Sequence, residues 1–233
     1  MELIPVIDLL QGQAVLAHQG LRKHYRPLCS PLCPSSDPLE VIAAYLKLHP
    51  FRTLYIADID AIEKKGDNGI IINRIRQRFP DLILWIDCGW PPVNNQPWQI
   101  PVIGSESLSE DWRRNLPGLD TSWILSLDFD AHGFRGPKSL LERSDVWPQE
   151  VILMCLNRVG SGHGPDWHHL NHYLRHHPEK DWIASGGIRH QQDLHDLENM
   201  GIRRALSASA LHQGTVTPET NKSRHLKGSG FHP

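Results

Sequence analysis

Short apolar runs alternate along this chain with stretches in which apolar positions recur at helical spacing. We predict strands at residues 3–8, 53–60, 82–87, 100–104, 122–128, 151–156, 181–185 and 203–208. Helices are predicted at residues 37–49, 69–79, 165–177 and 190–201. Asp37 is the expected N-cap of the first helix, because Pro38 then takes the first helical position. Continuously apolar strands that alternate with helices indicate a parallel sheet buried on both faces.

Eight such strands in one chain favour a closed barrel over an open sheet. We therefore predict an α/β fold, a (β/α)8 TIM barrel, as a single domain over residues 1–219. Some outer helices are expected to be shortened, since residues 90–99 are rich in Pro and Asn and residues 108–118 offer only a short helix. The polar, glycine-containing residues 220–233 are expected to form a flexible tail.

The two halves of the chain resemble each other, which predicts half-barrel internal symmetry. Asp8 ends the first predicted strand and Asp128 ends the fifth, each followed by a polar turn that contains glycine. Glycine also follows the third strand in residues 86–90 and the seventh in residues 184–188. The segments after strands four and eight are similar as well. Three matches in the same order indicate a weak internal repeat.

Composition narrows the classes of function. The 233 residues are 39% hydrophobic and 21% charged, which is typical of a globular protein. With 24 Lys and Arg against 26 Asp and Glu, the chain has no basic field for nucleic acid. No apolar run approaches the roughly 20 residues of a membrane span, and Glu2 and Asp8 do not suit a signal peptide. We expect a cytoplasmic protein that can still bind compact anions through backbone amides.

Two groups of residues raise the question of a metal. Cys29 and Cys33 have half of a zinc-site pattern, but no second cysteine pair follows, and two reduced thiols in a proline-rich loop are the ordinary explanation. His168, His172 and His176 recur every four residues and share one face of a predicted helix. Because this helix belongs to the outer ring of the barrel, a solvated histidine face is the ordinary outcome. We expect neither a metal nor an organic cofactor.

Asp8 and Asp128 are the candidate catalytic residues. In a barrel, the carboxyl ends of the strands and the following loops form the working face. The two carboxylates would lie opposite each other at this mouth, an arrangement that suits paired acid and base chemistry if their pKa values differ. The alternative is that each aspartate only caps the loop that follows it.

The glycine-rich turns are candidate phosphate sites, because glycine lets backbone amides approach an anion. The first site comprises Ser185, Gly186, Gly187, Ala208 and Ser209, after strands seven and eight. Its symmetric twin comprises Gly89, Gly104 and Ser105, after strands three and four. Two such sites around two carboxylates suit an elongated bisphosphate. Arg22, Lys23 and Arg26 in the first loop are expected to close over the ligand, or else to form a solvated basic loop.

The segments IPVIDLLQGQAV, YIADIDAI, IGSESL, SLDFDAHG and ASGGIRHQQDLHDLENMGI carry a family resemblance. Over about residues 1–219, the chain resembles the histidine-biosynthesis barrels, namely ProFAR isomerase and the cyclase subunit of imidazole glycerol phosphate synthase. The resemblance implies a half-barrel-symmetric (β/α)8 fold, an acid and a base at Asp8 and Asp128, and the two phosphate sites named above. The isomerase opens an aminoaldose ring and completes an Amadori rearrangement without metal or cofactor.

Four positions depart from the family pattern. Asp87 stands in a stretch that is usually glycine, and Val159 stands in the segment where Asp-Gly-Thr is usual. Met154 replaces an assisting threonine, and Ala208 replaces a phosphate-binding glycine. Asp87 would place a negative charge inside one of the phosphate sites, which disfavours a phosphate there.

Residues 26–38 and 55–68 resemble a side branch of these barrels that occurs in methanogens and methylotrophs, beside the methanofuran and methanopterin pathways. The leading hypothesis is a diverged barrel that transfers protons on a small phosphorylated substrate, with one phosphate or two, in one-carbon cofactor biosynthesis. The second is a genuine isomerase of histidine biosynthesis. The third is a non-catalytic barrel that binds a ligand or partner enzyme, motivated by Met154, Val159 and Ala208. Either a second copy of the chain or a partner enzyme could be its protein partner.

Overall fold

Eight parallel strands close into a barrel in the computed structural model, which describes residues 1–92, 98–112 and 122–218. The strands, in chain order, are β1 (Glu2–Leu10), β4 (Thr53–Asp58), β5 (Ile83–Asp87), β6 (Gln99–Gly104), β7 (Ile124–Asp130), β9 (Glu150–Cys155), β10 (Asp181–Ser185) and β11 (Arg204–Ser207). Each pairs with the next, and β11 pairs with β1 to complete the ring. The predicted (β/α)8 barrel is confirmed, with every strand end within two residues of its predicted position.

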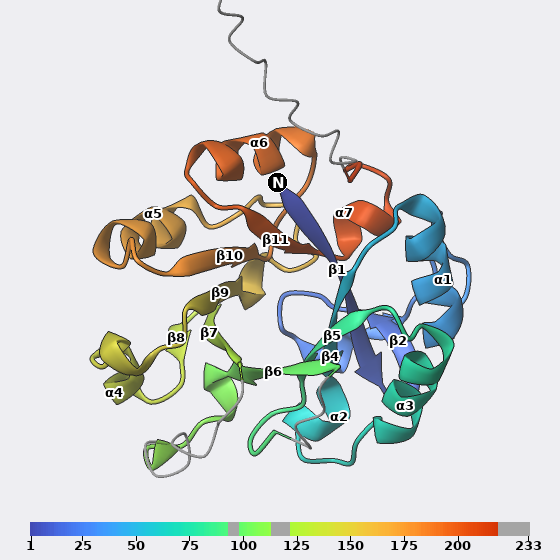
Figure 1. Cartoon of the computed structure of the whole chain (residues 1–233), viewed down its shortest axis with the longest axis horizontal. Coiled ribbons are helices and arrows are strands. Elements are labelled where there is room, and N and C mark those ends of the chain that lie inside the picture. Colours follow the sequence, from blue (N-terminus) through green and yellow to red (C-terminus); the bar gives the residue numbers. More distant parts are fainter. Residues whose placement is uncertain (93–97, 113–121, 219–233) are drawn as a thin grey trace, which may run out of the picture.

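Helices surround the strands (Figure 1). The four predicted helices are α1 (Pro38–Leu48), α3 (Gly69–Arg78), α5 (Trp167–His176) and α6 (Gln191–Asn199). The remaining connections are short, with α2 (Ile59–Ile62), α4 (Lys138–Leu141), α7 (Ser209–His212) and the 3-10 turns η1 (Arg22–His24), η2 (Ser105–Ser107), η5 (Ser144–Val146) and η6 (Leu156–Arg158). Asp37 caps α1 as predicted, because its carboxylate accepts a hydrogen bond from the Leu39 amide at 2.7 Å. None of the described helices combines the length and apolar character needed to cross a membrane.

Three sequence-based expectations fall wholly or partly outside the described residues. The irregular segment predicted at 90–99 includes residues 93–97, and the short helix predicted at 108–118 includes residues 113–118. The predicted tail at 220–233 lies entirely outside the described part of the chain.

Alternation along the strands divides the core into an inner and an outer cluster. Each strand contributes a buried apolar side chain to the inside of the barrel: Ile4, Tyr55, Trp85, Val102, Ile124, Ile152, Ile183 and Leu206. The intervening residues pack outward against the helices. At the amino-terminal end of the strands, Arg204 pairs with Glu150 and lies 5.6 Å from the Trp85 ring centroid. The barrel centre is thus packed, and a site is available only beyond the other ends of the strands.

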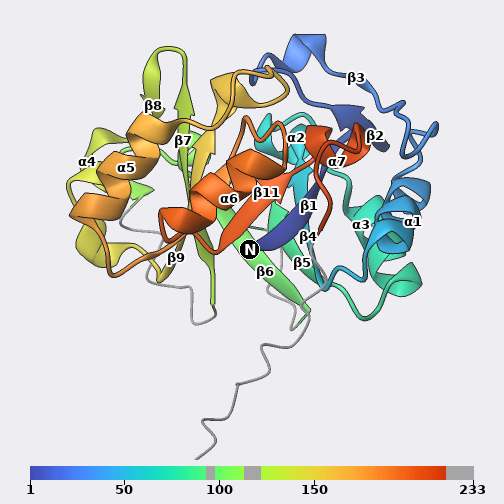
Figure 2. The same ribbon diagram turned by 90° about the horizontal axis from the view of Figure 1, so that it is seen from above.

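Two short hairpins, which the sequence analysis did not predict, extend strands β1 and β7 beyond the barrel. Strand β2 (Gln13–Leu16) pairs antiparallel with β1, and β8 (Gly133–Arg135) pairs antiparallel with β7. Asp8 faces Val15 in the first ladder, and Asp128 faces Arg135 in the second. Both hairpins rise from the same end of the barrel (Figure 2). A further short strand, β3 (Arg26–Pro27), pairs with β2.

A buried polar network holds the first hairpin in place. The Asn68 side-chain amide donates to Asp58 at 2.7 Å and to Asp60 at 2.9 Å. Its oxygen accepts from the Gly12 amide at 2.8 Å, and Asp60 also accepts from the Gln11 amide. Gln11 and Gly12 have φ values of 50° and 78°, which leave their amides facing this network. The acidic residues of segment 55–68 therefore support the turn that follows Asp8.

The loop that carries two cysteines is docked on the barrel through a serine. Ser30 Oγ lies 3.0 Å from His212 Nδ1, and Tyr45 Oη lies 2.7 Å from His212 Nε2. Cys33 is buried beside Ser30, whereas Cys29 is exposed. The two thiols therefore occupy different environments, and neither belongs to a cluster of possible metal ligands among the described residues. The half-zinc-site reading is not supported.

Candidate active site

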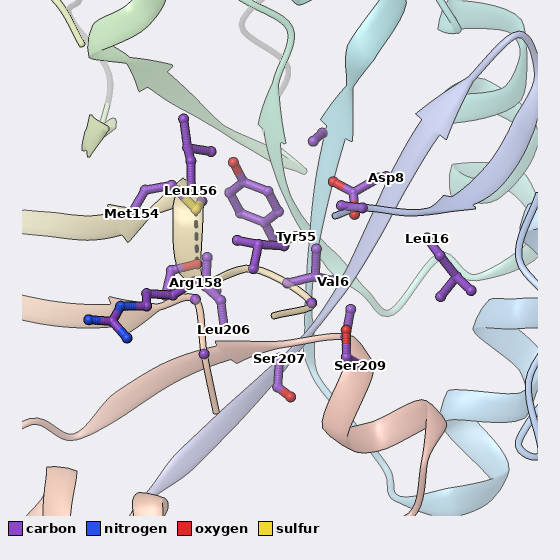
Figure 3. A pocket seen from close by; sticks show the side chains of 18 of the residues that line it. Val6, Asp8, Leu16, Tyr55, Met154, Leu156, Arg158, Leu206, Ser207 and Ser209 are labelled. Carbon is purple, nitrogen blue, oxygen red and sulfur yellow. Dashed lines mark hydrogen bonds between the residues drawn. The ribbon is translucent and has the colours of Figure 1, made fainter. Parts of the chain in front are cut away.

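A cavity of about 440 Å³ opens at the carboxyl ends of the strands. One side of it carries Asp8, Asp87, Glu106 and Asp128, together with Arg22. The other side carries the turns after β10 and β11. Figure 3 shows this pocket, with Tyr55 and Val6 near Asp8 and with Ser207 and Ser209 toward the second side. Acidic groups and candidate anion-binding turns therefore share one enclosed space.

Asp8 comes from β1 and is the least constrained of these carboxylates. Its carboxylate lines the cavity and accepts no hydrogen bond from any described residue. Burial raises the pKa of Asp8 to about 7, against the opposing effect of Arg22. A carboxylate that is free of donors and only weakly stabilised as an anion has the properties of a general base.

Asp128 is held much more firmly. Its Oδ1 accepts from the Ser126 hydroxyl at 2.6 Å, and its Oδ2 accepts from the Glu106 amide at 3.0 Å. The side chain is only 3% exposed. Burial raises the pKa of Asp128 to about 8, and the negative charges of Glu106 and Asp87 act in the same direction. Asp128 is therefore largely protonated at neutral pH and has the properties of a general acid.

Asp87 lies beside Asp128 at the end of β5. The Gly89 amide donates to Asp87 Oδ1 at 3.0 Å, and the Tyr55 hydroxyl lies 3.4 Å from Asp87 Oδ2. Burial raises the pKa of Asp87 to about 7, and the Gly89 hydrogen bond opposes this shift. Asp87 is thus a third carboxyl group in the cavity that holds its proton close to neutral pH.

The residues of the predicted second phosphate site lie next to the chain's own carboxylates. Gly89, Gly104 and Ser105 do not contribute to the lining of the cavity. The Gly89 amide is used by Asp87, and the Ser105 hydroxyl lies 2.7 Å from the Arg135 carbonyl and 3.3 Å from Asp128. Amides and hydroxyls that would bind an anion here are already bound to the chain's own carboxylates, which also repel a second anion.

The predicted first phosphate site does line the cavity, with all five of its residues, Ser185, Gly186, Gly187, Ala208 and Ser209. Glycine is required in this turn, since a Cβ at Gly187 would lie 2.2 Å from the Gly164 carbonyl oxygen. The φ of Gly187 is +87°, a conformation that other residues rarely adopt. The Ser185 hydroxyl is directed to Met154 Sδ at 3.1 Å, the dashed line in Figure 3. Backbone amides are therefore the donors that this turn offers to a ligand.

The first loop reaches the cavity through Arg22 alone among its three predicted basic residues. Arg22 forms an ion pair with Glu106 across the mouth. Arg26 and Lys23 are exposed and do not line the cavity, and Arg26 donates back to the Tyr25 carbonyl at 3.0 Å. The prediction that Arg26 contacts the ligand is therefore not supported by its placement.

Sequence reasoning missed the role of Glu106 and the acidic grouping around it. A carboxylate directly after the predicted Ser105 was the available signal, yet its partner Arg22 is remote in sequence. Arg158, which lines the cavity after β9 and has a buried Nε with no hydrogen-bond partner among the described residues, was also missed. Only its position after the sixth barrel strand could have indicated it.

The histidines of α5 lie outside the cavity. Possible ligand atoms of Asp166, His168 and His169 lie within 4.8 Å of one another, whereas the tilted rings of His172 and His176 have centroids 4.2 Å apart. Asp166 serves as the N-cap of α5 and accepts from the His169 amide at 3.2 Å. Asp166 therefore has a structural role at the start of the helix.

Comparison with known proteins agrees with the geometry. The sequence model of a family described as "Histidine biosynthesis protein" matches residues 2–90 and 140–217. An uncharacterized protein of Methanocaldococcus jannaschii is 31% identical over 228 residues, covering 94% of this chain and 96% of that protein. The 1-(5-phosphoribosyl)-5-((5-phosphoribosylamino)methylideneamino)imidazole-4-carboxamide isomerase, or ProFAR isomerase, of Phocaeicola vulgatus is 25% identical over 254 residues, covering 93% and 96%. That of Halothermothrix orenii is 25% identical over 248 residues, covering 94% and 98%.

Proposed function

The chain belongs to the histidine biosynthesis protein family, and on this premise we propose that it transfers protons on a small substrate with one phosphate group. The observation that carries the proposal is that Asp8 and Asp128, near the carboxyl ends of β1 and β7, line one cavity in different environments. Two carboxyl groups with separated proton affinities can act as a base and an acid in one reaction.

The roles follow from the surroundings of each group. Asp8 removes a proton from a carbon next to a carbonyl or imine group, because its free carboxylate has the higher ionised fraction. Asp128 gives its proton to the substrate oxygen or nitrogen that takes up the electron pair of the broken C–H bond. Asp8 then returns the proton to the neighbouring carbon, while the hydroxyl on the first carbon gives its proton back to Asp128 and becomes a carbonyl. This completes an isomerisation in which no atoms are gained or lost.

The phosphate is assigned to the turns after β10 and β11. Support comes from the positive-φ glycines Gly186 and Gly187, which bring backbone amides to the cavity surface, and from Ala208 and Ser209 at the start of α7. On the opposite side, Asp87 and Asp128 disfavour an anion. The proposed substrate is therefore a monophosphate rather than a bisphosphate.

A genuine isomerase of histidine biosynthesis is the second candidate. The names of relatives that are 25% identical over nearly the whole chain favour it. That substrate carries two phosphoribosyl groups, however, and Asp87 makes a second phosphate unfavourable. Growth of an isomerase-null histidine auxotroph on this gene would support the second candidate, and no growth despite soluble expression would count against it.

A place in one-carbon cofactor biosynthesis is the finer part of the proposal. It rests on the similarity of residues 26–38 and 55–68 to the side branch described above. Deletion of the gene in its host, followed by measurement of methanofuran and methanopterin, tests it. A deletion strain with normal amounts of both cofactors would contradict this assignment without affecting the proposed chemistry.

Inorganic phosphate is a suitable probe for the phosphate site. In a titration followed by amide NMR, we expect the Gly186, Gly187 and Ser209 signals to shift and saturate. The Gly89 and Glu106 amides serve as internal controls, since both are already bonded to carboxylates. Larger shifts at Gly89 and Glu106 than at Gly187 would overturn the assignment.

Proton transfer can be tested before the substrate is known. Phosphorylated aldoses, ketoses and aminosugars are incubated with the protein in D2O, and carbon-bound deuterium is measured by mass spectrometry. Asp8→Asn should slow incorporation by roughly 10²-fold or more, the range of a positioned general base. Exchange that continues at the wild-type rate in Asp8→Asn would remove Asp8 from the mechanism. No exchange with any such compound, despite phosphate binding, would favour the non-catalytic barrel.

A further inference from the structure

We infer that the carboxyl groups of Asp87 and Asp128 hold one proton between them at neutral pH, and that Asp87 is the residue that keeps Asp128 in its proton-donating form. The shared proton is a property of the folded chain and requires no substrate. The second part rests on the proposed function, because it assigns the purpose of that proton.

The two carboxyl groups approach each other across Gly104. A Cβ at Gly104 would lie 3.1 Å from Asp87 Oδ2 and 3.1 Å from Asp128 Oδ2. Asp87 Oδ2 and Asp128 Oδ2 are therefore separated by no more than twice 3.1 Å. Asp87 is 6% exposed and Asp128 is 3% exposed, so little water separates or screens them.

Neighbouring groups do not supply the positive charge that two buried carboxylates would need. Asp87 and Asp128 form no ion pair with any described residue. Arg22, the cation on this side of the cavity, opposes the rise in the pKa of Asp87, but its guanidinium group is paired with Glu106. The negative charge of Glu106 raises the pKa of both aspartates further.

The remaining groups around the pair are neutral donors. The Tyr55 hydroxyl from β4 faces Asp87, and the Ser126 hydroxyl from β7 faces Asp128. The Gly89 and Glu106 amides reach one oxygen of each carboxyl. Hydrogen bonds of this kind stabilise one anion well, but they do not cancel the repulsion between two anions in a buried site. One bound proton removes that repulsion.

Asp87 then has a clear effect on the reaction. When Asp128 passes its proton to a substrate oxygen, the O–H bond of the carboxyl breaks and the electron pair stays on Asp128. The pair becomes doubly negative, which costs free energy, so Asp128 keeps its proton at neutral pH until a basic substrate oxygen or nitrogen accepts it, and readily takes a proton back afterwards. Asp87 acts through Asp128 as a positioning residue, because it raises the proton affinity of Asp128 to a value suited to neutral pH.

The test is a titration of the aspartate side chains by carbon-13 NMR in the ligand-free protein. In the wild type, we expect the Asp87 and Asp128 signals to follow two common steps, with one proton retained above pH 6. In Asp87→Asn, Asp128 should titrate as a single group, at least one pH unit lower. Asp130→Asn, at the partly exposed end of β7, is the matched control and should leave the pair unchanged.

Two outcomes overturn the inference: loss of both protons below pH 5 in the wild type, or an unchanged Asp128 titration in Asp87→Asn. If Asp87→Asn does not fold, the wild-type titration still decides the first point. Failure of the proposed function is seen separately, because deuterium exchange in Asp8→Asn depends on Asp8 whether or not the pair shares a proton.

Discussion

The guanidinium group of Arg22 is paired with the carboxylate of Glu106, 84 residues further along the chain. The contact joins the first loop to the turn after β6 and so spans the mouth of the cavity. The Gln19 amide adds a second attachment by donating to the Val159 carbonyl at 2.8 Å. The first loop is therefore held over the cavity from two sides.

Replacing Arg22→Met should loosen the first loop, because Glu106 loses its cation and the loop loses one of two attachments. We expect faster hydrogen exchange over residues 17–25 and a fall of about 1–2 kcal/mol in the free energy of unfolding, as for a partly buried ion pair. Lys23→Met is the matched control, since Lys23 is exposed. Equal exchange rates in both variants would show that the ion pair does not restrain the loop.

Gly104→Ala should push Asp87 and Asp128 apart, because the added methyl group would lie 3.1 Å from an oxygen of each. We expect a loss of about 1–3 kcal/mol in the free energy of unfolding, the usual cost of overpacking. The double variant Gly104→Ala/Asp87→Ala relieves one contact and should lose less than the sum of its single variants. Strict additivity in urea denaturation would contradict the close approach at Gly104.

Asn68→Asp should destabilise the fold strongly. The substitution keeps the shape of the side chain but removes the two hydrogen bonds to Asp58 and Asp60 and adds a third buried carboxylate. A loss of about 3–5 kcal/mol is expected, as for an uncompensated buried charge. Asn171→Asp makes the same chemical change on an exposed helix face and should cost about 0.5 kcal/mol or less. Similar losses in both variants, measured by urea unfolding, would show that the network contributes little.

His212 should make the fold less stable in mild acid. Burial lowers the pKa of His212 from 6.5 to about 4. Between these values the unfolded chain binds the extra proton and the folded chain does not, so stability is complete above pH 6.5 and is lost as the pH falls toward 4. The total effect is about 3 kcal/mol. His212→Gln should remove this contribution. If the free energy of unfolding, measured with urea, changes equally between pH 7 and pH 4 in the variant and the wild type, the prediction is refuted.

The three aspartates of the cavity should act in the opposite direction to His212. The pKa values of Asp8 and Asp87 are raised to about 7 and that of Asp128 to about 8. The folded chain keeps these protons where the unfolded chain has released them, so their stabilising effect is complete below pH 3.8 and is lost as the pH rises through 7 to 8. The free energy of unfolding should therefore increase as the pH is lowered from 8.5 to 6.5, a range in which the protonation of His212 changes little. The variant Asp87→Asn should show a smaller increase.

The barrel and half of the site could be predicted because their signals are local. Strand β10 (Asp181–Ser185) has an apolar centre, Trp182–Ala184, before its glycine turn, and α1 begins with its own cap and proline. Asp8 and Asp128 were found because a strand end defines the working face and the repeat places both residues there. Gly186 and Gly187 were found because glycine marks a turn whose backbone comes close to other atoms.

The other half of the site was not visible in this way. Asp87 was predicted to disturb a phosphate site, but its closeness to Asp128 across Gly104 depends on the register of β5, β6 and β7. The pairing of Arg22 with Glu106 and the docking of Ser30 on His212 each join remote segments. The hairpins after Asp8 and Asp128 were missed, because three or four residues carry too little periodicity to indicate a strand.

By itself, the sequence determined the order of strands and helices, the closed barrel and the pair of strand-end aspartates, since hydrophobic periodicity and turn residues act over a few neighbouring positions. Only the tertiary structure decided which donors are free and which are already used. Hydrogen bonding and charge repulsion depend on distances between segments far apart in the chain, and these distances are set by barrel closure. That is why the turn after β10 keeps amides available for a ligand, while the turns after β5 and β6 give theirs to Asp87 and Asp128.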